Sequence, residues 1–417
     1  MKRIITLCII ISAAELFCIS LRDIPGIIAS NSLPLKKQRL ELQSREIEIG
    51  NQLLRFTPNL VASGGMYHDT NYNWAVSGGV SSTLTVSQDI FFDQAVERLT
   101  YENFKTAYLQ FYQSELYDTY ALYVTALKDR ISLEIALSNE QLSKKQYEFV
   151  ASKKQSGNAS ELDLINALAE YDNDIYTSEL SRINAQSSLS KLAQKLELNT
   201  ITILEDVPAG MPLTPITASN TLIPAQRVFA AVSIASNSLS IEETRRLQTA
   251  LRRFAPFISV TGTADLVRHT YTTAAEAWVR NNSLDLSLGV SFNLPIWGRN
   301  EVLGKLQQTD LAIQRAKTDI ELAAKNTKKE LEESVLFHNN KTALLNVSRQ
   351  RLKSAELNTK MMAESYRLGV SSLIDFYQSE KSYREAKRDL AFLTYDVLLL
   401  KLNIGKLLDD TMRFLPK

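Results

Sequence analysis

Two stretches of the chain, residues 93–156 and 305–368, each run for 64 residues without a glycine or a proline. Glycine and proline are the residues that most disfavour a helix interior, so their absence over such lengths predicts two continuous helices. At 1.5 Å per residue each helix would be ~95 Å long. No globular core has that length, so the helices must pack side by side in an extended bundle or tube. This organisation argues against an ordinary α/β enzyme.

Aromatic and apolar residues recur at spacings of three and four along the first of these stretches. They form two runs, first Tyr101, Phe104, Tyr108 and Phe111, and then Leu116, Tyr120, Tyr123, Leu127 and Ile131. This spacing places them on one side of a helix and is typical of coiled-coil-like packing. The tyrosine-rich part, residues 101–123, is therefore interpreted as a helix-packing surface and not as a ligand site.

The chain contains the same unit twice. Three landmarks recur in the same order: ASNSL at 29–33 and 235–239, RFTP and RFAP at 55–58 and 253–256, and the glycine-x5-aspartate pairs Gly157/Asp163 and Gly369/Asp375. Internal similarity of this kind is the signature of repeated structural units. Within each unit the predicted order is helix, strand, strand, long helix, turn, helix.

The predicted boundaries follow from this duplication. They are a signal peptide at 1–20, a first repeat at 21–205, a linker at 206–224 and a second repeat at 225–417. The linker is rich in proline, which has a fixed φ and no backbone N–H, so no regular element is expected there. The predicted strands lie at about 58–68, 74–91, 257–268 and 283–296, and the predicted helices at 35–56, 93–156, 160–198, 305–368 and 372–404.

The N-terminus has the features of an export signal. The basic residues Lys2 and Arg3 precede an apolar run at 4–14, which is too short to span a bilayer. Small residues at Cys18 and Ser20 predict cleavage after Ser20. A lipidated Cys18 is the alternative, which the bulky residues before it disfavour. Cleavage after Ser20 would remove Cys18 and Cys8, the two cysteines of the chain, and leave no disulfide and no thiolate metal site.

The clearest predicted strand, residues 283–296, alternates between apolar and polar side chains over six cycles. Its apolar positions are Leu284, Leu286, Leu288, Val290, Phe292 and Leu294. Period-two alternation predicts a strand with one apolar face. Strands of about ten residues with this pattern are typical of transmembrane β-barrels. A half-exposed sheet in a soluble protein is the alternative for any single strand, but the long helices favour the barrel.

Four strands per chain cannot close a barrel by themselves. An open sheet edge is not tolerated in lipid, because its N–H and C=O groups find no water there. Two chains would give a narrow eight-stranded barrel filled by its own side chains, whereas three chains give twelve strands and room for a lumen. The polar positions of the strands would face that wet interior. The sequence therefore predicts a trimer.

Over nearly all of the mature chain, the sequence resembles a known family, the TolC-type outer-membrane efflux ducts. The resemblance depends on the duplicated unit, on the two glycine-x5-aspartate turns, and on FNLPIWGR at 292–299, which closes the last strand. The first repeat departs from the family at 88–91, where QDIF lacks the usual proline. The resemblance implies an α+β membrane protein, a homotrimer whose twelve-stranded outer-membrane β-barrel continues into a periplasmic α-helical barrel.

The resemblance also implies function and partners. The chain would be the passive exit duct of a tripartite efflux or type I secretion system, in contact with outer-membrane lipid. It would dock with a periplasmic adaptor and an inner-membrane pump of the RND or ABC type. A periplasmic adaptor or a coiled-coil envelope spacer is the alternative. An adaptor would carry one helical hairpin with compact β-domains, and a spacer would lack the paired strands.

Four residues match gating positions of the family. Asp375 matches a carboxylate that lines the periplasmic constriction, and Gln378 stands where the second carboxylate is usual. Asp163 and Tyr366 match positions that hold neighbouring hairpins together in the closed state. The arginine that is usual just after the glycine of the second turn is absent, and Ser371 stands in its place, so the family's gating network is incomplete.

Both aspartates also fit a purely structural role. Ser160-x-x-Asp163 and Ser372-x-x-Asp375 are capping-box patterns, in which serine and an acidic residue satisfy the first N–H groups of a helix. An acidic residue in the first turn also suits the helix dipole. One aspartate can serve as a cap and as part of a constriction, so both interpretations stay open.

Several classes of function are not supported. The formal net charge is +1, which gives no basic excess for a nucleic-acid partner. The histidines, His68, His269 and His338, stand apart from any metal-ligand spacing. No phosphate-binding glycine loop and no nucleophile–base pattern is present in the sequence, so no cofactor and no enzymatic activity are expected.

Overall fold

The computed structural model describes residues 18–68, 74–86, 88–157, 159–199, 203–206, 215–216, 229–251, 257–266, 270–271, 284–293, 301–368 and 370–411. Several sequence predictions lie outside these residues. They concern most of the signal peptide, most of the proline-rich linker, His269, Gly369 and the end of the FNLPIWGR segment.

The chain divides into two compact units, and the two longest helices contribute to both. Unit 1 consists of Met1–Lys36, Leu109–Arg227 and Thr327–Lys417. Unit 2 consists of Lys37–Tyr108 and Val228–Asn326.

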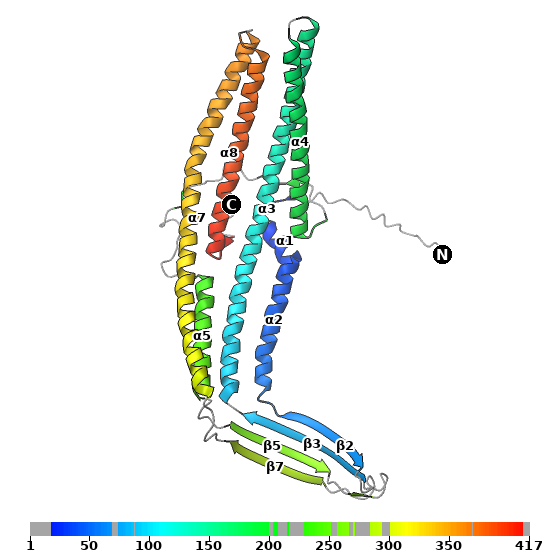
Figure 1. The fold of residues 1–417 in the computed structure, drawn as a ribbon, viewed down its shortest axis with the longest axis vertical. Helices are drawn as coiled ribbons and strands as arrows, with labels where there is room; N and C mark the ends of the chain where they lie inside the picture. Colours follow the sequence, from blue (N-terminus) through cyan, green and yellow to red (C-terminus); the bar gives the residue numbers. More distant parts are fainter. Residues whose placement is uncertain are drawn as a thin grey trace, which may run out of the picture. The chain divides into compact units, whose positions relative to one another are not determined.

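The helices of the two sequence repeats match in length, as expected of a duplication. The helices are α1 (Ile24–Asn31), α2 (Leu33–Leu54), α3 (Gln88–Gln155), α4 (Glu161–Leu196), α5 (Ala230–Leu251), α7 (Glu301–Arg367) and α8 (Leu373–Leu407). The long helices α3 and α7 have 68 and 67 residues, α4 and α8 have 36 and 35, and α2 and α5 have 22 each. In unit 1, α3 turns back into α4 and α7 turns back into α8, which gives two helical hairpins (Figure 1).

Both long helices begin earlier than the sequence predicted. Strand β3 ends at Val86 and α3 begins at Gln88, not at residue 93, because the segment QDIF has no proline and carries Asp89 in the first helical turn. Helix α7 begins at Glu301 and passes through Gly304, where the sequence predicted a break. One glycine costs a helix about 1 kcal/mol, which a helix of this length tolerates.

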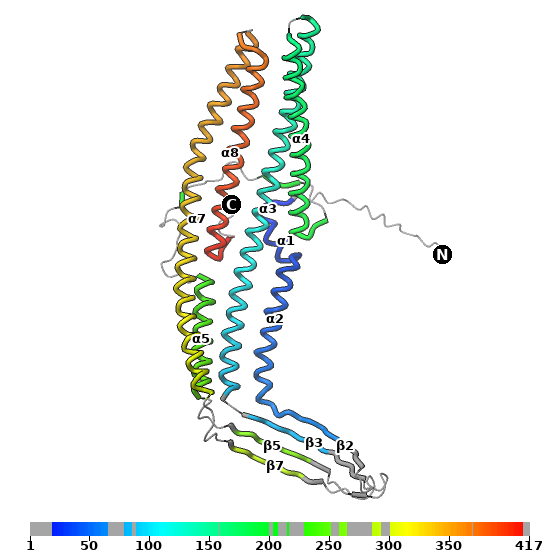
Figure 2. Tube along the Cα trace, in the orientation of Figure 1, coloured from blue at the N-terminus to red at the C-terminus, as the bar shows by residue number. Residues whose placement is uncertain are grey.

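Unit 2 holds an antiparallel sheet with the order β2-β3-β5-β7. Its strands are β2 (Asn59–His68), β3 (Trp74–Val86), β5 (Phe257–Leu266) and β7 (Leu284–Asn293), and the short β6 (Thr270–Tyr271) pairs with β3. Figure 2 traces the four long strands side by side. The central pair, β3 with β5, joins the first repeat to the second. The outer strands β2 and β7 each have one neighbouring strand within the described part of the chain.

The two faces of this sheet differ in chemistry. On β7 the alternating residues Leu286, Leu288, Val290 and Phe292 are 63–80% exposed. On the other side of the pleat, Ser287 shares a hydrogen bond of 2.6 Å with Thr263 of β5. The predicted alternation of apolar and polar faces is therefore present. Within the described ranges, no helix is both long enough and apolar enough to cross a membrane.

The core of unit 1 is built from helix positions spaced by three and four. Leu116, Tyr120, Tyr123 and Leu127 on α3 are fully buried, which confirms helix packing for the later part of the predicted stretch, from residue 116 onward. The other helices contribute the fully buried Leu192, Leu196, Leu345, Leu398 and Leu402. His338 also lies in this core, 1% exposed, and burial lowers the pKa of its imidazole.

One carboxylate joins three helices inside unit 1. Asp396 on α8 accepts a hydrogen bond from the ammonium group of Lys341 on α7 at 2.6 Å and another from Lys128 on α3. Partial burial acts to raise the pKa of the Asp396 carboxyl, but the hydrogen bonds and charges of the two lysines outweigh it and lower the pKa. We call these three residues the Asp396 clamp.

The residues before α1 also belong to unit 1. Strand β1 (Cys18–Ile19) pairs in parallel with β4 (Ile203–Leu204), so the start of the described chain is tied to the end of the first repeat.

Candidate functional site

The candidate site consists of the two hairpin turns and the first helical turns that follow them. In the first turn, Gly157 has a φ of +78°, a left-handed conformation that glycine adopts without strain. Its N–H donates to the carbonyl of Lys154 at 2.9 Å. The side chain of Lys154 also pairs with Glu161 across the turn. These contacts close α3 and start α4 within a few residues.

Both predicted capping boxes are present. The Ser160 hydroxyl accepts the N–H of Asp163 at 3.1 Å, and the Asp163 carboxylate accepts the N–H of Ser160 at 3.0 Å. The equivalent distances for Ser372 and Asp375 are 3.1 and 3.2 Å. Hydrogen bonds from the hydroxyl and the backbone N–H of Ser160 lower the pKa of the Asp163 carboxyl. The structural role of both aspartates is therefore fixed by geometry, and their role in a constriction stays a prediction.

The second turn is held by stacked aromatic rings. Tyr366 on α7 stacks on Phe376 of α8, with ring centroids 6.1 Å apart and an interplanar angle of 12°. The N–H groups of Val370 and Ser371 both donate to the carbonyl of Ser365, at 2.9 and 3.3 Å. In this structure Tyr366 thus contacts its own hairpin.

The structure does not bring Asp163 and Tyr366 together. Among the described residues, the hydrogen bonds of the Asp163 side chain remain within its own turn, to Ser160. The link between hairpins that the resemblance implies for these two residues is therefore a prediction about contacts outside this single chain.

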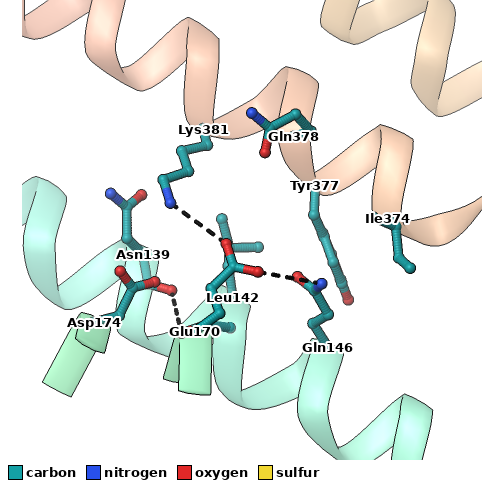
Figure 3. Close-up of a pocket in the computed structure, with 10 residues that line it drawn as sticks. Asn139, Leu142, Gln146, Glu170, Asp174, Ile374, Tyr377, Gln378 and Lys381 are labelled. Atoms are coloured by element: carbon teal, nitrogen blue, oxygen red, sulfur yellow. Dashed lines mark hydrogen bonds and ion pairs between the residues drawn. The ribbon is translucent and has the colours of Figure 1, made fainter. Parts of the chain in front are cut away.

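A different set of side chains joins the two hairpins. The Lys381 ammonium group on α8 lies 3.5 Å from one carboxylate oxygen of Glu170 on α4, and Gln146 on α3 donates to the other oxygen at 3.5 Å. Figure 3 shows Glu170 between Lys381 and Gln146, with Gln378 on the neighbouring turn of α8. These side chains line a small cavity of about 40 Å³, which can hold water but not a transported solute. We call Gln146, Glu170, Gln378 and Lys381 the inter-hairpin cluster.

Sequence reasoning identified only Gln378 of this cluster. Glu170 follows the capping residue Asp163 by seven residues, which places the two on the same side of α4. Lys381 lies one turn beyond Gln378 on α8. Following the side of each capping aspartate along its helix would have pointed to Glu170, but not to its partner on the other hairpin. No group of three or more side chains suited to a metal ion occurs in the described portion of the chain.

No protein-family model matches the sequence. The outer membrane protein TolC of Escherichia coli K12 is 22% identical over 342 residues, which cover 79% of this chain and 69% of TolC. The predicted resemblance to the TolC-type outer-membrane proteins is confirmed.

Solved structures show that the chain has the TolC-type channel fold. The outer-membrane channel CmeC of Campylobacter jejuni matches with a TM-score of 0.77 at 14% identity, over 94% of this chain and 88% of CmeC. CusC, described as forming a transmembrane channel, matches with a TM-score of 0.76 at 14% identity, over 93% of this chain and 91% of CusC. Because the TolC-type relatives are outer-membrane proteins and channels, they also confirm the predicted outer-membrane location and the prediction that the chain is not an enzyme.

Proposed function

We propose that this chain is the outer-membrane exit duct of an export system, and that three copies form it. The observation that carries the proposal is the sheet of unit 2, which exposes an apolar row on β7 and ends in two outer strands. Lipid satisfies an apolar face but not the backbone of a sheet edge. Pairing of β7 with β2 of the next copy satisfies both edges, and three copies give a twelve-stranded barrel wide enough for a lumen.

The helices would continue this duct on the periplasmic side. Two hairpins from each of three chains give a wall of long helices, and the hairpin turns would form its periplasmic entrance. Exposed apolar residues gather at these turns, including Leu162, Leu368 and Val370. Apolar groups at an exposed end suit docking to a partner protein. The partner would be a periplasmic adaptor that links the duct to an inner-membrane pump, in a tripartite efflux or type I secretion system.

The mass of the detergent-extracted protein tests this assembly. We expect the full-length protein from envelope membranes to be a trimer by light scattering, after subtraction of the detergent mass. We also expect extraction to require detergent, because the β7 row would lie in lipid. A monomer released without detergent would contradict the duct and support a periplasmic adaptor or spacer.

At the entrance, Asp163, Tyr366, Asp375 and Gln378 are proposed to surround the constriction. The missing arginine of the family network leaves Ser371 at that position, and the inter-hairpin cluster supplies another contact between hairpins. We assign this cluster the role of holding the two hairpins of one chain together in the closed duct.

Removal of the positive charge of Lys381 from the inter-hairpin cluster should favour the open duct. The Lys381 and Glu170 side chains are 31% and 39% exposed, so each pair is expected to contribute only about 0.5 kcal/mol. Three pairs per trimer then contribute about 1.5 kcal/mol, or roughly tenfold in the closed-to-open ratio. Lys381→Met should raise the open fraction in single-channel recordings by that order.

A charge exchange serves as the matched control. Glu170→Lys combined with Lys381→Glu keeps one ion pair per chain and should return the open fraction toward that of the unmodified protein. If Lys381→Met leaves the recordings unchanged, or if the exchanged pair opens the duct as much as the single variant, the cluster does not hold the hairpins.

A further inference from the structure

The residues just before α1 are part of the folded core of unit 1. Cys18 and Ile19 form β1, and only 1% of the surface of Ile19 is exposed. Ile24 and Ile28, on the helix that follows, are 0% and 2% exposed and continue the same buried segment. An export signal that is cut away before function has no need of such packing.

The backbone of Ile19 is held from two directions. Its carbonyl accepts the N–H of Glu205 at 3.1 Å, next to β4. It also lies 2.9 Å from the hydroxyl of Tyr123 on α3, which is 2.6 Å from the Glu205 carbonyl. Tyr123 is fully buried, so removal of residue 19 would leave its hydroxyl with one partner fewer in a place without bulk water.

Strand β4, which pairs with β1, and the residues that follow it are fixed to helices α3 and α8. Arg130 on α3 donates to the Leu204 carbonyl at 2.7 Å, and Tyr395 on α8 donates to the Asp206 carboxylate at 2.6 Å. On the other side of β1, the N–H and the hydroxyl of Ser20 donate to Asp23 at 2.9 and 2.7 Å. Residues 18–20 are thus connected to α3, to β4 and to the start of α1.

We propose that the signal peptide is removed on the N-terminal side of Cys18, so that residues 18–20 remain in the mature protein. Cleavage after Ser20, which the small residues at 18 and 20 predict, would delete β1. It would thereby leave β4 without this pairing strand and expose the core beside Ile24. The mature protein then keeps Cys18 and loses Cys8.

The intact mass of the protein purified from envelope membranes tests this directly, in the wild type and in Ile19→Val. The wild-type mass is expected to equal that of a chain that starts at or before Cys18 and lacks the apolar run 4–14. If residue 19 is retained, the variant is lighter than the wild type by one methylene group. If cleavage follows Ser20, the two mature proteins have identical masses, because the substituted residue has been removed.

Two features keep the test decisive. Any group attached to Cys18 adds the same mass to both proteins, so the one-methylene difference is preserved. Cys8→Ala lies in the segment to be removed and should leave the mature mass unchanged. The proposal would be overturned by a wild-type mass that corresponds to a chain starting at Leu21 or later. A mass that corresponds to a chain still carrying the apolar run would also overturn it.

Discussion

Asp396→Ala is expected to lower the free energy of unfolding by about 2 kcal/mol, because it leaves the ammonium groups of Lys128 and Lys341 close together without their shared carboxylate. This loss of unfolding free energy should be smaller than the loss on breaking a fully buried ion pair, since 30% of the Asp396 side chain remains exposed. The measurement is denaturant unfolding of the detergent-solubilised protein, followed by its helical circular dichroism.

Asp389→Ala is the matched control. Asp389 lies on the same helix and also accepts from two cations, Arg351 and Arg388, both at 3.0 Å. The Asp389, Arg388 and Arg351 side chains are 36%, 37% and 63% exposed, and pairs this open to solvent contribute about 0.5 kcal/mol. If Asp396→Ala destabilises the protein no more than Asp389→Ala, the Asp396 clamp is not a stabilising element.

The contribution of the clamp should also depend on pH in a defined direction. The pKa of Asp396 is lower in the folded protein than in the unfolded chain, where a value of about 3.9 is usual. The stabilisation is therefore fully present above about pH 3.9 and is lost as the pH falls toward the depressed folded value. The stability difference between the wild type and Asp396→Asn should be constant near neutral pH and shrink in that acidic window.

Asp375→Asn is expected to weaken the block of the duct by multivalent cations, because a trimer would lose three carboxylates at its entrance. We expect the blocking concentration of hexaamminecobalt(III) to rise about tenfold, which corresponds to ~1.4 kcal/mol of lost attraction. Single-channel recordings at fixed ionic strength measure this directly, since screening by salt weakens the same attraction.

Two further variants separate charge from capping at this turn. Ser372→Ala removes the hydroxyl that caps α8, at a cost of about 1 kcal/mol, but keeps the carboxylate, so the block should be unchanged. Gln378→Glu adds a second carboxylate one turn farther along and should strengthen the block. If Ser372→Ala weakened the cation block as much as Asp375→Asn, the aspartate would act only through the helix cap.

The fold was predictable because long-period patterns dominate this sequence. The helices are visible as stretches without glycine and proline, and strand β7 as strict alternation of apolar and polar residues. The ends of these elements were less predictable, since the start of α3 at Gln88 depends on the local absence of a proline. The capping boxes at Ser160 and Ser372 were predictable because they need only a four-residue pattern.

The contacts between helices were not predictable from pattern alone. Glu170 and Lys381 are 211 positions apart in sequence, and Lys128 and Asp396 are 268 apart. Each residue is ordinary on its own helix, and only the packing of one hairpin on another selects its partner. The pairing of β1 with β4 was hidden for a related reason, because composition assigned residues 18–20 to the export signal.

The sheet order β2-β3-β5-β7 means that the junction between the two repeats is a pair of neighbouring strands, β3 and β5. In the proposed trimer the junction between chains, β7 with β2, continues the same antiparallel alternation. Repeats joined within one chain and repeats of neighbouring chains would then meet through the same kind of strand pair around the ring, so the proposed assembly would be a pseudo-hexamer of six half-chains joined in pairs.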